Sequence, residues 1–207
     1  MSKRTRVMIV DDHFMVRTGL AEAMRGERDL IVVGKAASGA EAIAQYTQTP
    51  ADVVTMDFRL PDMTGVEATL AILATDPAAR ILMLSVLDGE EDIWRAVQAG
   101  VRGYLLKSCE SADVLGAVRR LSMGGTAFPE EVEAKIAARK ARENLTPREI
   151  EVLAHIVAGR SNKEIIQAMA LSEGTVKLHI GNVLEKLGAQ DRTQAAILAV
   201  QRGIVHL

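Results

Sequence analysis

The first part of the chain alternates short apolar runs with longer amphipathic stretches. Runs rich in β-branched and other apolar residues occur at 7–10, 30–33, 53–56, 81–86 and 103–106. Continuous apolar runs of this length are typical of strands that are buried on both faces of a sheet. Amphipathic stretches of helical length alternate with them, at 13–26, 38–48, 64–75, 88–99 and 110–123. Strand–helix units repeated in this way predict the α/β class, with a doubly wound, five-stranded parallel sheet.

Capping patterns mark the expected starts of several helices. In a capping box, a Ser or Thr before the helix and a Glu three residues later each accept a hydrogen bond from the other's backbone N–H. Ser38 with Glu41 and Thr64 with Glu67 fit this pattern. We therefore expect helices to begin directly after residues 38 and 64.

The alternation ends near residue 123, and no strand is predicted beyond it. A charged stretch up to 143 is expected to form an exposed linker helix. Helical segments follow at 146–158, 161–169, 172–187 and 191–205, and three of them open with capping patterns, Thr146-Pro147-Arg148-Glu149, Ser161-Asn162-Lys163-Glu164 and Asp191-Arg192-Thr193-Gln194. We expect a first domain at 1–122, a linker at 123–143 and an all-α, four-helix domain at 144–207.

Composition restricts the class of protein further. The 207 residues are 48% hydrophobic and 25% charged, which is ordinary for a globular protein. No apolar run approaches the roughly 20 residues of a membrane span, and the single cysteine excludes an intramolecular disulfide and a Cys-rich zinc site. We expect a cytoplasmic protein with no membrane partner. The net charge of −2 by itself argues against a protein that coats DNA.

Polar residues with a common chemistry follow the predicted strands. Asp11 and Asp12 end the first strand, Asp57 the third, Ser85 the fourth and Lys107 the fifth. The carboxyl ends of parallel strands meet at one edge of a sheet, so these side chains are expected to converge. Clustered carboxylates repel one another and invite a hard cation, and oxygen ligands suit Mg²⁺, which often shares a phosphate. The lysine supplies a positive charge and the serine a hydrogen bond for a phosphoryl group.

Residues 1–122 resemble the receiver domain of two-component systems, a flavodoxin-like fold. The resemblance is carried by Asp57-Phe58-Arg59-Leu60-Pro61-Asp62-Met63-Thr64-Gly65, with Pro four and Gly eight residues after the aspartate. It implies that Asp57 accepts a phosphoryl group from a histidine kinase. It also implies three Mg²⁺ ligands besides Asp57, namely Asp12 directly, Asp11 largely through water, and the backbone carbonyl of Arg59. Ser85 and Lys107 would hold the phosphoryl oxygens, and Tyr104 would turn inward when Ser85 moves.

The second domain contains a pattern typical of a helix-turn-helix. The short helix at 161–169 is followed by Ala170-Leu171-Ser172 and a longer helix. The outer face of that longer helix offers side chains that can contact base edges or phosphates, and a small residue, at Thr175, Lys177, Leu178, Gly181 and Asn182. The pattern therefore indicates a surface for double-stranded DNA.

Residues 144–205 are similar to the LuxR-type DNA-binding domain. The similarity lies in Leu145–Leu153, in Gly159–Ile165, in Thr175-Val176-Lys177 with His179, and in Lys186-Leu187. Together with the receiver, it identifies the chain as similar to the NarL/FixJ response regulators. It implies that Lys177, Leu178 and Gly181 face the major groove. It places Asn162, Lys163, Asn182 and Arg192 near phosphates and gives the helix at 191–205 much of a dimer contact.

These patterns predict a phosphorylation-dependent transcription regulator that binds DNA as a homodimer. We do not expect an enzyme, beyond a receiver that assists its own phosphoryl transfer and dephosphorylation. A phosphatase with Asp57 as nucleophile is one alternative, but its acid/base position two residues on is occupied by Arg59. A DNA-binding regulator that acts without phosphate, or a protein-interaction module with a receiver-like fold, is the other.

Overall fold

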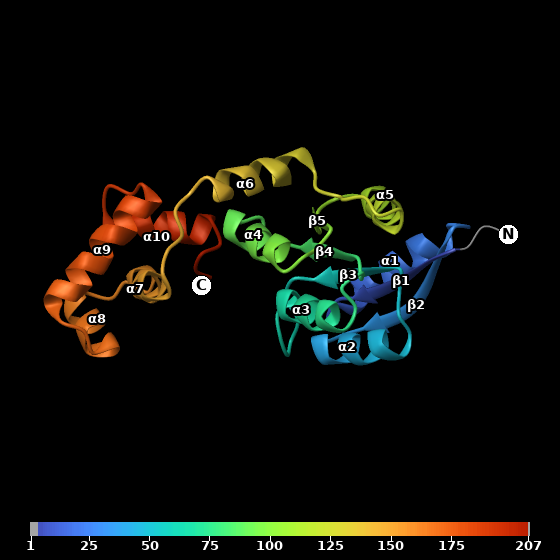
Figure 1. The fold of residues 1–207 in the computed structure, drawn as a ribbon, viewed down its shortest axis with the longest axis horizontal. Coiled ribbons are helices and arrows are strands. Elements are labelled where there is room, and N and C mark those ends of the chain that lie inside the picture. Colours follow the sequence, from blue (N-terminus) through green and yellow to red (C-terminus); the bar gives the residue numbers. More distant parts are fainter. Residues whose placement is uncertain (1–3, 207) are drawn as a thin grey trace. The chain divides into compact units, whose positions relative to one another are not determined.

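A computed structural model describes residues 4–206, and these residues form two compact units. The first holds the chain up to Leu87 and Ile93–Glu133, and the second holds the chain from Ala134 onward with Asp88–Asp92. Figure 1 shows the elements of each unit. Within the described part of the chain, no helix combines the length and the apolar character that crossing a membrane requires.

Within residues 4–206, the first unit contains a five-stranded parallel sheet with the order β2-β1-β3-β4-β5 (Figure 1). Its strands are β1 (Thr5–Val10), β2 (Leu30–Ala36), β3 (Val53–Asp57), β4 (Ile81–Ser85) and β5 (Gly103–Leu106). The predicted class and strand positions are confirmed. β2 continues past its predicted end at 33, because Gly34 and Lys35 still pair with Met8 and Ile9 of β1, although they break the apolar run.

Helices cover both faces of this sheet. They are α1 (Phe14–Arg25), α2 (Gly39–Gln48), α3 (Gly65–Thr75), α4 (Glu90–Gln98) and α5 (Ser111–Ser122). Successive residues of a strand point to opposite faces, so Val7 and Ile9 of β1 join the core formed with α1 and α5, whereas Met8 and Val10 point to the other face. Both pairs are buried, which explains why the strand reads as a continuous apolar run.

The capping patterns were partly right in this unit. Thr64 and Glu67 form a complete capping box at the start of α3. At the start of α2, Ser38 accepts a hydrogen bond from the Glu41 N–H, but the Glu41 carboxylate accepts from the N–H of Ala37 rather than from that of Ser38. The prediction of a full box at Ser38 was therefore wrong, because the Glu41 carboxylate reaches past Ser38 to the residue before it, Ala37.

The outer edge of β5 is paired with a segment that follows α5. The Ala127 N–H donates to the Arg102 carbonyl at 2.9 Å, and the Tyr104 N–H donates to the Ala127 carbonyl at 3.1 Å. Ala127 thereby forms a parallel bridge with Gly103 and is almost fully buried. A part of the predicted linker therefore completes the hydrogen bonding of the last strand.

The remaining elements are helical, as predicted. They are α6 (Glu130–Lys140), α7 (Pro147–Val157), α8 (Asn162–Met169), α9 (Glu173–Leu187) and α10 (Arg192–Gln201). Complete capping boxes open α7 at Thr146 and α8 at Ser161, whereas the Gln194 side chain accepts from the N–H of Gln190 rather than from that of Asp191. α10 ends at Gln201 instead of the predicted 205, and Gly203 takes a left-handed conformation soon after it.

Two apolar clusters hold the helices α7 to α10 together. Leu153 of α7 packs with residues of α9 and α10, a cluster made of Leu153, Val183, Leu187, Ala195 and Ala199. Val152, on the neighbouring position of α7, belongs to a second cluster with Ile156, Ile165 and Val176 that joins α7, α8 and α9. The second cluster fixes the relation between the two helices of the predicted helix-turn-helix.

Ala170 is the only non-glycine residue with a positive φ in the described range 4–206, with φ of 53° at the end of α8. An L-residue with a Cβ pays about 1–2 kcal/mol for this left-handed conformation, whereas glycine adopts it freely. We expect Ala170→Gly to raise the free energy of unfolding of this unit by about 0.5–1 kcal/mol, after glycine's greater freedom in the unfolded chain is subtracted. Urea unfolding followed by NMR signals of α8 and α9 measures the change, and a loss of stability would contradict it.

Candidate functional site

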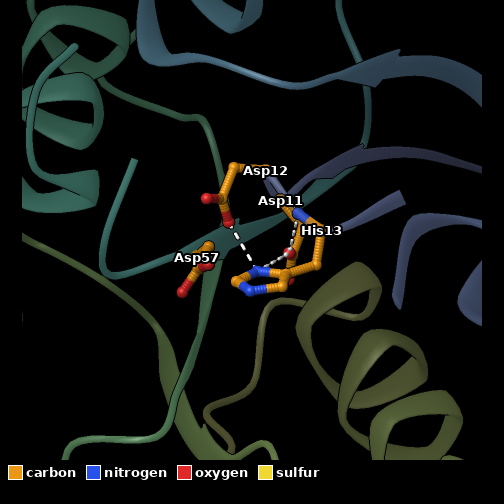
Figure 2. Close-up of side chains that lie close together, drawn as sticks. All are labelled: Asp11, Asp12, His13 and Asp57. Carbon is orange, nitrogen blue, oxygen red and sulfur yellow. Dashed lines mark hydrogen bonds and ion pairs between the residues drawn. The ribbon is translucent and has the colours of Figure 1, made fainter. Parts of the chain in front are cut away.

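The carboxylates predicted to converge do meet at the carboxyl edge of the sheet. β1 and β3 are neighbours with Val10 opposite Met56, so Asp11 after β1 comes beside Asp57 at the end of β3. The chain adds β2 on one side of β1 and β3 on the other, so a topological switch point lies between β1 and β3. Open α/β sheets bind ligands at such a point. Asp11 and Asp57 are buried and Asp12 is exposed. Figure 2 shows the three carboxylates close together.

Lys107 connects the two buried carboxylates. Its Nζ lies 2.7 Å from Asp11 Oδ2 and 2.6 Å from Asp57 Oδ2. Burial opposes the charge of Lys107, but its ion pairs with Asp11 and Asp57 outweigh that effect and raise its pKa. Burial raises the pKa of Asp57, and Lys107 opposes this rise. The lysine is thus the cation that makes two adjacent buried carboxylates tolerable.

The donor atoms fit a divalent cation that prefers oxygen. Asp11, Asp12, His13 and Asp57 each offer one ligand atom, and these atoms lie within 4.8 Å of one another. Asp11 Oδ2 is buried and, among the described residues, accepts no hydrogen bond of good geometry, although the Lys107 ammonium is close. His13 Nδ1 lies 2.6 Å from Asp12 Oδ1 (Figure 2). The carboxylate oxygens suit Mg²⁺, whereas the imidazole nitrogen does not.

The loop that follows Asp57 is closed on itself. The Gly65 N–H donates to the Phe58 carbonyl at 2.8 Å, and Arg59 forms an antiparallel bridge with Thr64. A Cβ on Gly65 would lie 2.0 Å from the Asp57 carbonyl oxygen, so this position requires glycine. The Arg59 N–H also reaches Asp57 Oδ1, at 3.4 Å. The spacing of Asp57 and Gly65 in the sequence thus corresponds to a tight turn directly after Asp57.

Ser85 and Tyr104 are both connected to Leu87. The Leu87 N–H donates to Ser85 Oγ at 2.9 Å, and the Tyr104 hydroxyl donates to the Leu87 carbonyl at 2.8 Å. The resemblance implied that Tyr104 turns inward when Ser85 moves, and here its ring is already fully buried while Ser85 is bound to Leu87. Any rotation of Ser85 towards Asp57 therefore has to release the Leu87 N–H.

The predicted base-reading residues form an exposed strip on α9. Ser172 caps this helix, and the turn from α8 passes through Ala170. Lys177, Leu178 and Gly181 are exposed, and Leu178 is 62% exposed despite its apolar side chain. Lys177 is paired with Glu173 one turn earlier, at 2.8 Å. An exposed pair of this kind contributes little stability, so the lysine can leave it for a ligand.

Several of the other residues predicted to contact DNA already have partners within the protein. Thr175 Oγ1 lies 2.8 Å from Ser172 Oγ at the helix cap, and Arg192 donates to the Arg160 carbonyl at 2.5 Å. Asn182 is half-buried and helps to lower the pKa of Glu149. Asn162 and Lys163 occupy the first turn of α8, where Lys163 is exposed. Their contacts with phosphates stay predictions.

The sequence reading missed two features of the sites. The Arg17 guanidinium donates to the Asp11 carbonyl at 2.5 Å, one turn into α1 from the acidic pair. The ammonium of Lys186, in the last turn of α9, binds the buried Glu149 carboxylate of α7 at 2.9 Å. Arg17 is i+6 from Asp11 and Lys186 is 37 positions after Glu149, so no local spacing pattern marks either contact.

Comparison with known proteins agrees with both halves of this description. The family described as "Response regulator receiver domain" matches residues 7–119, and the family "Bacterial regulatory proteins, luxR family" matches residues 143–199. The response regulator protein VraR of Staphylococcus aureus is 42% identical over 206 residues, which cover 97% of this chain and 99% of VraR.

Solved structures give the same result. The response regulator ChrA of a heme-sensing two-component system is 34% identical and covers 99% of this chain, with all of ChrA matched and a TM-score of 0.58. The RcsB response regulator of Salmonella typhimurium shares the fold at 22% identity, with a TM-score of 0.74 over 94% of this chain and 98% of RcsB. The chain therefore belongs to the two-component response regulators that join a receiver domain to a LuxR-type helix-turn-helix domain.

Proposed function

We propose that this response regulator is switched by phosphorylation of Asp57 and then binds double-stranded DNA as a homodimer. The observation that carries the proposal is the position of Lys107, whose ammonium lies within 2.7 Å of both Asp11 and Asp57 at the edge of the sheet. A buried carboxylate beside a cation and two further carboxylates is suited to accept a phosphoryl group when a metal shares the charge.

Each residue has a defined part in the transfer. A carboxylate oxygen of Asp57 forms the bond to phosphorus while the bond between phosphorus and the histidine nitrogen of the kinase breaks. Lys107 then exchanges its bond to Asp57 for one to a phosphoryl oxygen, and Ser85 can donate its hydroxyl to another. Asp11, Asp12, Asp57 and the Arg59 carbonyl are the groups that would hold Mg²⁺, which would neutralise charge on the phosphoryl oxygens.

The helix α9 is the part that we expect to contact DNA. Its exposed strip contains Lys177, whose ammonium can contact a guanine or a phosphate. Beside it, the apolar side chain of Leu178 can contact a thymine methyl. α10 exposes Ile197 and Val200, at 52% and 39%, three residues apart on one helix. These apolar side chains support a contact with a second copy of the chain, and a dimer would bring two α9 helices to paired half-sites.

The test compares DNA binding with and without phosphoryl transfer. A duplex selected from a random pool by acetyl-phosphate-treated protein is titrated in a gel-shift assay with Mg²⁺ present. We expect the donor to increase the affinity of the wild type and to leave Asp57→Ala unchanged. An Asp57→Ala chain that responds to donor like the wild type would refute the switch. Binding without a dependence on salt would instead favour a protein partner. Release of phosphate from a generic ester would revive the phosphatase.

Lys177→Ala should weaken binding to the selected duplex about tenfold, as expected from the loss of one contact to a base or phosphate. Lys35→Ala, which removes an exposed lysine of β2, is the matched control and should bind normally. Fluorescence anisotropy over a range of salt concentrations measures both variants. Equal affinity of the two variants would remove Lys177 from the interface.

A further inference from the structure

We propose that Asp62 is a positioning residue for phosphoryl transfer, which fastens the loop after Asp57 to the amino-terminal end of α2. The inference rests on the proposed function of Asp57. It gives a role to a residue that the sequence reading placed only within a motif. In this role Asp62 contacts neither the phosphoryl group nor the metal, and it acts through the backbone of the loop 57–65.

Two short hydrogen bonds make the connection. The Asp62 carboxylate accepts from the Gly39 N–H and from the Ala40 N–H, each at 2.8 Å. These are the first two residues of α2, whose N–H groups have no partner within the helix. The bonds from Ala40 and Gly39 lower the pKa of Asp62, so the carboxylate is ionised at neutral pH. The positive end of the helix dipole also favours a negative charge at this place.

The next residue of the loop contacts the same helix start. A Cβ on Gly39 would lie 2.4 Å from Met63 Cγ, so the methionine side chain rests against the bare glycine backbone. Asp62 binds the N–H groups of the first turn, and Met63 packs on its first residue. Two consecutive residues of the loop 57–65 thus contact the start of α2.

The loop can transmit this attachment to the acceptor. Its two ends are joined by the bond from Gly65 to Phe58 and by the bridge between Arg59 and Thr64. The Arg59 carbonyl, a predicted Mg²⁺ ligand, therefore belongs to a closed turn whose tip is fixed at Asp62. Loss of the attachment should let the turn move as a unit and misplace that carbonyl, as happens when groups that orient a metal ligand are removed.

A purely structural role of Asp62 would be to stabilise α2, and a control separates the two roles. Ser38 caps the same helix from its own side, through a bond from the Glu41 N–H at 3.2 Å. Ser38→Ala therefore weakens the start of α2 but leaves both bonds of Asp62 in place. If Asp62 acts only on helix stability, Asp62→Ala and Ser38→Ala should have the same effects.

Amide hydrogen exchange of the full chain tests the attachment without metal or phosphate. We expect the backbone N–H groups of residues 58–60 and 62–65 to exchange about tenfold faster in Asp62→Ala, which corresponds to about 1.4 kcal/mol. Ser38→Ala should leave the exchange of these amides unchanged. Asp62→Asn keeps one acceptor oxygen, so its exchange rates should lie between those of the wild type and of Asp62→Ala. The test therefore does not depend on whether the alanine variant folds. Unchanged exchange in both Asp62 variants would overturn the proposal.

Mg²⁺ titration by NMR and initial rates with acetyl phosphate then test the consequence. Asp62→Ala should bind Mg²⁺ about tenfold more weakly, at the low end for groups that orient a metal ligand, whereas Ser38→Ala should match the wild type. A wild type that takes up no phosphoryl group would overturn the proposed function itself. If the wild type is phosphorylated, but Asp62→Ala and Ser38→Ala have equal Mg²⁺ affinities and equal rates, only the role of Asp62 is overturned.

Discussion

Lys107→Met is expected to slow phosphoryl transfer to Asp57 by about a hundredfold, the range found when a preorganised group that stabilises transition-state charge is removed. Lys107 Nζ contacts both Asp11 and Asp57, so its loss leaves buried carboxylates without the cation that now offsets their repulsion. Methionine preserves most of the length of the side chain and removes the charge. Initial rates of phosphorylation by acetyl phosphate, at fixed Mg²⁺ concentration, measure the effect.

Two further variants make this result specific. Lys107→Arg keeps the charge but changes a compact ammonium into a planar fork, so we expect only partial recovery of the rate. Lys35→Met removes an exposed lysine of β2 and should accept phosphate at the rate of the wild type. If Lys107→Met also accepts phosphate at that rate, the lysine has no part in the transfer and the central observation of the proposed function loses its force.

The second large effect is expected from substitution of Glu149, a residue of α7 that is only 3% exposed. Its carboxylate accepts from the Thr146 N–H at 2.8 Å and binds the Lys186 ammonium at 2.9 Å. Glu149→Ala removes both bonds and leaves the lysine without its main partner. We expect the unit containing α7 to α10 to lose about 3 kcal/mol of its free energy of unfolding, the low end for breaking a buried ion pair. Urea titrations followed by NMR signals of α7 and α9 report this unit separately.

Glu164→Ala is the matched control for this experiment. Glu164 completes the same kind of capping box, with Ser161, but lies exposed at the start of α8. Its removal should therefore cost clearly less than the removal of Glu149, because water can solvate the groups that it leaves. Equal losses in the two variants would mean that the pair with Lys186 adds nothing to the cap at Thr146.

The contribution of Glu149 should also depend on pH. Burial opposes its charge, but the bonds from Thr146, Lys186 and Asn182 outweigh burial and lower the pKa of Glu149 below its ordinary value. The folded state therefore favours the ionised carboxylate. This contribution is complete above the ordinary glutamate pKa of about 4.5 and is lost as the pH falls towards the lower folded value. The difference in stability between wild type and Glu149→Ala should narrow below about pH 4.5, and a constant difference would contradict this assignment.

Local patterns predicted the elements because the strands other than β2 are largely buried on both faces and most helices begin at a capping residue. The acidic site followed from topology, since parallel strands place Asp11 and Asp57 at the same edge. Contacts distant in sequence were beyond such reasoning. The bonds from α2 to Asp62 and from Lys186 to Glu149 depend on how helices pack, which no spacing in the chain records. Even within capping motifs the partner was not always predicted, since the Glu41 carboxylate accepts from the N–H of Ala37 and not from that of Ser38.

Ala127 has a practical consequence for anyone who expresses the receiver alone. A fragment that stops at residue 122, where the sequence places the domain boundary, would leave the Tyr104 N–H and the Arg102 carbonyl on the rim of β5 without their present partner. An exposed strand edge of this kind can pair with strands of other molecules, so we expect such a fragment to associate or precipitate. A fragment extended through Phe128 keeps its own cover, and only oligomers formed by the longer fragment would report on the signalling state of the receiver.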